Sequence, residues 1–220
     1  MNNQDISPPS GFYINTEMKI ICIGRNYREH AEEMGNAIPD EPLFFLKPDS
    51  SIIKNNKPFF LPDFSDEIHY EAEIVVRICK LGKSIDEKFA YRYYDAVTLG
   101  IDITARDLQR RQSERGDPWE ICKSFDGSAP LGKFLLVSEL GNVHDLPFRL
   151  EKNGEVVQQS STAHLIFGID RLISYVSRFF TLKTGDLIFT GTPSGVGPLQ
   201  KNDHLKGYIA NQPVIDFYIR

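Results

Sequence analysis

The feature that most constrains the fold is an alternation of apolar and polar residues over positions 68–78, IHYEAEIVVRI, in which only Val75 departs from the pattern. Successive side chains of a strand point to opposite sides, so every second residue of this segment would share one face. That face would consist of Ile68, Tyr70, Ala72, Ile74, Val76 and Ile78. The pattern predicts one long strand with an apolar face in the core, and it places Glu71 and Glu73 together on the other face.

Shorter apolar runs predict further strands, and helical spacing predicts a few helices. The expected strands are residues 19–23, 43–46, 96–103, 134–137, 148–152, 155–158 and 186–190. Asn153-Gly154 predicts a hairpin turn between the strands at 148–152 and 155–158. The expected helices are residues 26–34, 86–94, 104–111 and 166–180. Because strands and helices do not alternate regularly, the pattern indicates an α+β, mainly β architecture. No linker interrupts the chain, so we expect an N-terminal arm over 1–18 and a single domain over 19–220.

The composition excludes several classes of protein. With a net charge of −5 and a pI of about 5.6, the chain lacks the basic surface that binds nucleic acid or anionic membranes. No apolar stretch is long enough to span a bilayer, and the first residues do not resemble a secretion signal. Three widely spaced cysteines are typical of reduced thiols, which favours a cytoplasmic protein.

Three carboxylates are candidates for a metal site. Glu71 and Glu73 share one strand face, and Asp102 lies in an otherwise apolar strand, where an unpaired charge is costly. An all-oxygen set favours Mg²⁺ or Mn²⁺, with Ca²⁺ as a substitute, over Zn²⁺. The alternatives are that the glutamates form a solvated strand face and that Asp102 caps the following helix.

The segment after the first strand offers a candidate base. His30 and Glu33 are three residues apart on a predicted helix, so Glu33 would orient His30 as a general base for water. The alternative is a surface histidine beside an acidic patch. Arg25 precedes this helix and is interpreted either as a carboxylate clamp or as an ordinary surface arginine.

Four further polar residues are candidates for substrate contacts. Arg106 lies one helical turn beyond Asp102, and Gln109 one turn further. Lys123 lies in an apolar context, where a snorkelling lysine is the common alternative. Thr192 belongs to a glycine-rich loop that does not fit a nucleotide-binding motif, but whose amides would suit a small carboxylate. Each of these also has an ordinary structural interpretation.

The order and wording of six motifs resemble the catalytic domain of the fumarylacetoacetate hydrolase family. They are IGRNYREHAEEMG, EPLFFLKPDSS, IHYEAEIVV, GIDITARDLQ, PWEICKSFDGSAPLG and GDLIFTGTPSGVGP. The resemblance extends from about residue 19 to the C-terminus. It is strongest to the short single-domain members, the acylpyruvases and oxaloacetate decarboxylases.

This resemblance implies a mixed β-sandwich roll with a few peripheral helices, a homodimer, and a role for each candidate residue. Glu71, Glu73 and Asp102 match the family's Mg²⁺ or Mn²⁺ ligands. His30 and Glu33 match its water-activating pair on a lid helix. The remaining matches, to substrate-contacting or motif positions, are Arg25, Arg106, Gln109, Lys123 and Thr192.

The resemblance also implies the chemistry. We expect hydrolysis of small 2,4-diketo acids to pyruvate and a carboxylate, decarboxylation of oxaloacetate, or both, through a metal-bound pyruvate enolate. The alternative enzymes are a 2-hydroxyhepta-2,4-diene-1,7-dioate-type isomerase or decarboxylase and a fumarylpyruvate hydrolase. The alternatives without catalysis are a silent metal-binding homologue and a β-rich calcium- or carbohydrate-binding module.

Overall fold

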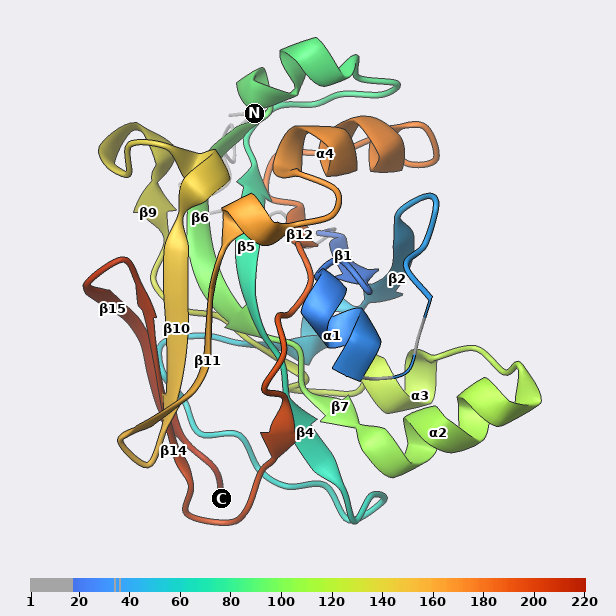
Figure 1. Ribbon diagram of the computed structural model, residues 1–220, viewed down its shortest axis with the longest axis vertical. Coiled ribbons are helices and arrows are strands. Elements are labelled where there is room, and N and C mark those ends of the chain that lie inside the picture. Colours follow the sequence, from blue (N-terminus) through green and yellow to red (C-terminus); the bar gives the residue numbers. More distant parts are fainter. Residues whose placement is uncertain (1–17, 34, 36) are drawn as a thin grey trace, which may run out of the picture.

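The computed structural model describes residues 18–33, 35 and 37–220, and its largest element is a six-stranded mixed sheet (Figure 1). Apart from Met18, the predicted N-terminal arm lies outside the described residues. The strand order is β2 (Leu43–Lys47), β1 (Ile20–Gly24), β12 (Leu187–Phe189), β5 (Ala72–Ile78), β6 (Tyr94–Ile101) and β9 (Leu135–Leu136). β1 and β12 run parallel, whereas the other neighbours are antiparallel.

The predicted long strand is in fact two strands that belong to different sheets. β4 (Ile68–Tyr70) pairs with β7 (Thr104–Ala105) and β13 (Gly197–Pro198), whereas β5 pairs within the large sheet. Glu71 lies at the break between them. The apolar face is buried as predicted, but the opposite face of β5 is buried too, because the chain covers this sheet on both sides.

A second, four-stranded antiparallel sheet packs against the first. Its order is β11 (Glu155–Ser161), β10 (Pro147–Lys152), β14 (His204–Ile209) and β15 (Gln212–Tyr218). The hairpin predicted at Asn153-Gly154 joins β10 to β11. Close packing between the sheets requires Gly207, because a Cβ there would lie 2.3 Å from a methyl group of Leu99. These two layers confirm the expected mainly β architecture.

The helices are short and peripheral, and α1, α2 and α3 lie on the side of the molecule away from the four-stranded sheet (Figure 1). They are α1 (Arg28–Glu33), α2 (Arg106–Arg115), α3 (Glu120–Lys123) and α4 (Ile169–Ser177). The segment predicted as a helix at 86–94 is a 3₁₀ helix, η2 (Glu87–Arg92). None of the helices in the described part of the chain has the length and apolarity needed to span a bilayer.

The remaining elements are a two-stranded parallel sheet and four further short 3₁₀ turns. The sheet pairs β3 (Ile52–Ile53) with β8 (Ala129–Pro130). The turns are η1 (Asp49–Ser51), η3 (Val137–Glu139), η4 (Val143–Asp145) and η5 (Thr162–His164). Because β8 follows α3, the small sheet holds in place the chain just beyond Lys123, the last residue of α3.

Candidate active site and metal centre

All ten candidate residues line one cavity, which has a volume of about 560 Å³. They are Arg25, His30, Glu33, Glu71, Glu73, Asp102, Arg106, Gln109, Lys123 and Thr192. They come from α1, α2, α3, the strands of the large sheet and the residues at their ends, and the loop after β12. Several lining residues were not singled out from the sequence, namely Glu67, His69, Arg110, Ser113, Glu114 and Trp119.

Three buried carboxylates meet in this cavity. Glu73 lies in β5 opposite Gly100 of β6, Glu71 directly precedes β5, and Asp102 directly follows β6. One oxygen of each lies within 4.8 Å of the others, and the three residues are only 5%, 2% and 1% exposed for Glu71, Glu73 and Asp102. They therefore form neither a solvated strand face nor a helix cap, since α2 begins only at Arg106.

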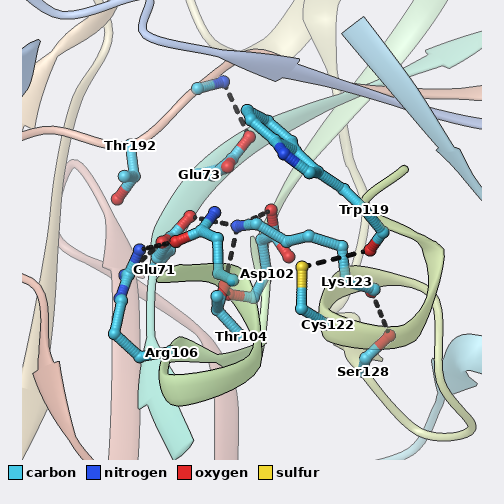
Figure 2. Close-up of polar contacts among 12 residues, drawn as sticks. Glu71, Glu73, Asp102, Thr104, Arg106, Trp119, Cys122, Lys123, Ser128 and Thr192 are labelled. Atoms are coloured by element: carbon cyan, nitrogen blue, oxygen red, sulfur yellow. Dashed lines mark hydrogen bonds and ion pairs between the residues drawn. The ribbon is translucent and has the colours of Figure 1, made fainter. Parts of the chain in front are cut away.

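Two basic side chains contact the carboxylates. Lys123 donates to Glu71 Oε2 at 2.8 Å, to Asp102 Oδ2 at 2.8 Å and to Thr104 Oγ1 at 2.6 Å (Figure 2). Arg106 donates to Glu71 Oε1 at 2.5 Å. Lys123 is therefore not the snorkelling lysine that its apolar context allowed. All three protons of its ammonium group are donated to protein oxygens.

The shifts in pKa follow from these contacts. Burial alone would raise the pKa of Glu71, but Lys123 and Arg106 hold it well below its ordinary value. Burial alone would lower the pKa of Lys123, but the Asp102 and Glu71 carboxylates raise it. Glu71 is therefore ionised and Lys123 is protonated at neutral pH.

Glu73 shows that the site fits a cation. Its Oε2 accepts from the Gly191 N–H at 2.6 Å, but no basic side chain contacts it among the described residues. Burial, together with the charges of Asp102 and Glu71, raises the pKa of Glu73 well above its ordinary value. A divalent cation among the three carboxylates would relieve this repulsion. The donor set is oxygen only, which suits Mg²⁺ or Mn²⁺ better than Zn²⁺.

Lys47 is a functional candidate that the sequence analysis did not identify. Its ammonium group is fully buried and lies 2.9 Å from Asp102 Oδ1. It also donates to the Lys123 carbonyl, and to the carbonyl (3.1 Å) and hydroxyl (2.9 Å) of Ser128. Lys47 thus joins edge strand β2 to one metal-site carboxylate and to the backbone of Lys123. Only its position in the motif EPLFFLKPDSS could have indicated this role.

Gln158 of β11 is a second residue that the sequence analysis did not identify. It accepts from Ala72 N–H at 2.9 Å and donates to Thr192 Oγ1 at 2.9 Å and to the Pro193 carbonyl at 3.0 Å. Thr192 in turn donates its hydroxyl proton to the Ala72 carbonyl at 2.9 Å. The loop after β12 is therefore fastened to the start of β5, and the Thr192 hydroxyl proton is already engaged.

The predicted pair on α1 is formed. His30 Nδ1 lies 3.1 Å from Glu33 Oε2, and His30 is 8% exposed. Donation from Nδ1 to the carboxylate leaves Nε2 with the lone pair, and Nε2 has no partner among the described residues. Glu33 Oε1 also accepts from the Gly195 N–H at 3.3 Å, which ties α1 to the loop after β12.

The buried thiol of Cys122 lies in α3 beside Lys123, but it is not a nucleophile at neutral pH. Burial raises its pKa to about 11, and its thiol donates to the Trp119 carbonyl at 3.2 Å. The thiolate that nucleophilic attack requires is therefore not formed under ordinary conditions.

Comparison with known proteins places the chain in a family. Residues 19–217 match the family described as Fumarylacetoacetate (FAA) hydrolase C-terminal. The mitochondrial oxaloacetate tautomerase fahd-1 of Caenorhabditis elegans is 42% identical over 86% of this chain and 88% of its own length. Oxaloacetate tautomerase YcgM of Escherichia coli K12 is 40% identical over 85% and 86%.

A solved structure shows the same fold. The crystal structure of fumarylpyruvate hydrolase from Pseudomonas aeruginosa in complex with Mn²⁺ and pyruvate superposes with a TM-score of 0.86, at 37% identity, over 91% of this chain and 88% of that one. Both the sequence match and the superposition span nearly the whole described chain. This chain therefore belongs to the fumarylacetoacetate hydrolase family.

Proposed function

We propose that this chain is a divalent-metal-dependent enzyme of small 2-oxo acids, and that it interconverts the keto and enol forms of oxaloacetate. The observation that carries the proposal is the meeting of three buried carboxylates with the His30–Glu33 pair in one cavity. Relatives that are 42% and 40% identical bear the name oxaloacetate tautomerase, which supports this reaction for the present chain.

Glu71, Glu73 and Asp102 would hold Mg²⁺ or Mn²⁺, with Ca²⁺ as a substitute. When bound, the ion supplies a Lewis acid that stabilises negative charge on the 2-oxo oxygen of the substrate. The Mn²⁺ and pyruvate in the structure of the Pseudomonas aeruginosa relative support this class of cofactor and ligand.

Lys123 would act on the substrate through its charge. Because its three protons are donated to Glu71, Asp102 and Thr104, it offers a fixed positive charge rather than a further hydrogen bond. Fixed charges in a buried site stabilise developing negative charge without reorganising during the reaction.

Gln109, Arg106 and the loop after β12 would orient the substrate. Gln109 Oε1 accepts from Arg106 at 2.5 Å, which leaves the Gln109 amide N–H groups for a substrate oxygen. Thr192 donates its hydroxyl proton to Ala72, and the N–H groups of Gly191 and Gly195 donate to Glu73 and Glu33. The backbone N–H of Thr192 itself would therefore be a donor for the substrate's first carboxylate.

His30 would move the proton. With Nδ1 held by Glu33, Nε2 can take a proton from C3 of oxaloacetate as the C2–C3 double bond forms. Return of that proton from His30 to the C2 oxygen would then complete the enol and leave His30 neutral again, and the reverse sequence would regenerate the keto form. The same nitrogen could instead deprotonate water. Deprotonation of water by Nε2 would support hydrolysis of acylpyruvates as a second activity. Decarboxylation of oxaloacetate would need no base.

The test is to follow oxaloacetate enol decay by ultraviolet absorbance, and pyruvate release from acetylpyruvate and oxaloacetate, each with Mg²⁺, Mn²⁺, Ca²⁺ or EDTA. We expect metal-dependent tautomerisation, and the two pyruvate rates rank hydrolysis against decarboxylation. If the protein accelerates none of the three reactions in any metal, the proposed function is wrong.

We also propose that the chain forms a homodimer in the cytoplasm. The free state of its three cysteines supports a reducing compartment. Light scattering on the purified protein measures the mass in solution, and a monomer at micromolar concentration would contradict the homodimer.

A further inference from the structure

The cavity contains four arginine and lysine side chains, and three of them are already paired. Lys123 and Arg106 contact the carboxylates of the metal site. Arg110 forms a two-pronged pair with Glu67, at 3.0 and 2.5 Å. Arg25 is the exception, because its guanidinium makes no hydrogen bond or ion pair with any residue that the structure describes.

The backbone at Arg25 is an independent sign of function. Its φ is +57°, in the left-handed region of the backbone. Residues other than glycine, asparagine and aspartate rarely adopt this conformation, because their Cβ then lies too close to a carbonyl oxygen. The other described non-glycine residues with positive φ are four asparagines, which suit this region, and two residues at a bend and a turn; they are Asn55, Asn56, Asn153 and Asn202, and Ser84 and Ala210. Such strain costs about 1–3 kcal/mol and is found most often at active sites and ligand-binding sites.

The surroundings of Arg25 would strengthen its attraction for an anion. Arg25 is half-buried between β1 and α1, and it lines the cavity together with the apolar side chains of Ile23, Phe45 and Trp119. An apolar wall of this kind lowers the local dielectric constant, so an ion pair formed there is stronger than one in open solvent. An unpaired guanidinium in this setting is suited to bind a carboxylate.

We propose that Arg25 binds the second carboxylate of the substrate and so selects 2-oxo dicarboxylates over 2-oxo acids with a neutral distal group. This inference rests on the proposed function for the position of the first carboxylate and the 2-oxo group. It favours oxaloacetate over acylpyruvates with neutral acyl groups. Arg110 is a weaker candidate for the same role, because it would first have to leave Glu67.

The experiment measures binding separately from turnover. Trp119 lines the cavity and is the chain's single tryptophan, so its fluorescence in a stopped-flow instrument reports the Kd before the ligand reacts. The two ligands are oxaloacetate and its 4-methyl ester, which lacks the distal charge, both with Mg²⁺. The variants are Arg25→Asn, which tolerates the left-handed backbone, and Arg25→Lys, which keeps the charge. The control is Arg28→Gln, because Arg28 is exposed and lies outside the cavity.

We expect the wild type to prefer oxaloacetate over the ester by roughly 10- to 100-fold, the ratio typical of a hydrogen-bonded charge pair. Arg25→Asn should bind both ligands with the affinity that the wild type has for the ester. Arg25→Lys should recover part of the preference, and Arg28→Gln all of it. A preference that survives in Arg25→Asn, or that the wild type lacks, overturns the role of Arg25. A wild type with the preference but without metal-dependent turnover contradicts the proposed function instead.

Discussion

The ammonium group of Lys47 lies 2.9 Å from Oδ1 of Asp102, in a place where neither side chain reaches solvent. Lys123 contacts the other oxygen of the same carboxylate at 2.8 Å. Asp102 is thus held between two cations, one from the edge strand β2 and one from α3. Its orientation depends on both.

Replacing Lys47 by methionine should destabilise the metal-free protein by about 3–5 kcal/mol, because it leaves Asp102 buried without one of its two counter-charges. A bound metal ion supplies positive charge to the same carboxylate, so the loss should be smaller in Mn²⁺. Urea unfolding in EDTA and in Mn²⁺ measures both values. The exposed Lys57→Met is the control, and equal stability of the two variants in EDTA would contradict this role for Lys47.

Glu73→Gln should stabilise the metal-free protein while removing metal binding. Glu73 has a raised pKa from an ordinary value of 4.5. The folded protein therefore keeps a proton that the unfolded chain releases as the pH rises above about 4.5. The free energy of unfolding of the wild type therefore decreases as the pH rises from about 4.5 to the pKa of Glu73 in the folded protein. The glutamine variant carries no ionisable group at this position and does not lose this stability.

The measurement is thermal unfolding in EDTA from pH 5 to pH 8, where each 1 kcal/mol corresponds to roughly 2–4 °C. The advantage of Glu73→Gln should grow with pH and turn into a deficit once Mn²⁺ is added. The control is Glu155→Gln on the exposed start of β11. A variant that unfolds at or below the wild-type temperature in EDTA at pH 8 would refute the proposed repulsion.

His30→Gln should separate the reactions. Tautomerisation and hydrolysis need a base, so each should slow by roughly 10²- to 10⁴-fold, whereas decarboxylation of oxaloacetate should lose much less. Steady-state rates for the three reactions give the comparison. The neighbouring Glu32→Gln, on the exposed side of α1, should change none of them. Equal losses in all three reactions would remove His30 from the role of base.

Gln158→Leu should loosen the loop after β12 without altering the metal ligands. The substitution leaves the buried Ala72 N–H without its partner, at a cost of about 1–3 kcal/mol, and releases Thr192 and Pro193. We expect a raised KM for oxaloacetate with an unchanged Kd for Mn²⁺. Titration with Mn²⁺ and steady-state kinetics test the two parts, and an unchanged KM would mean that the loop does not depend on Gln158.

The sequence predicted local elements better than their partners. The β10–β11 hairpin was predicted because an Asn-Gly turn is a signal within the turn itself. The break at Glu71 was not predicted, because the alternation continues through it and only pairing with β7 and β13 divides the strand. The C-terminal hairpin of β14 and β15 was missed as well, although it forms half of the second sheet.

Some residues of the candidate site could be predicted from the sequence and others could not. The family resemblance indicated all ten candidates, and the structure brings them into one cavity. Whether each acts as the resemblance implies stays a prediction. Lys47 and Gln158 were missed because their importance comes from partners far along the chain, Asp102 for one and Thr192 for the other. Arg25 was ambiguous until its lack of a partner and its backbone conformation were known.

The carboxylates of the cavity come from the core, whereas part of its wall comes from the exposed helix α2. This difference affects how such a chain can evolve. The carboxylates lie in or directly beside strands embedded in the core, so altering them disturbs the packing of the large sheet. Beyond Gln109, α2 lines the cavity with Arg110, Ser113 and Glu114, all of which are exposed. Substitutions on this outer helix can reshape the cavity wall with little loss of stability. Adaptation to a new substrate should therefore accumulate in α2 first, while the chemistry is inherited unchanged.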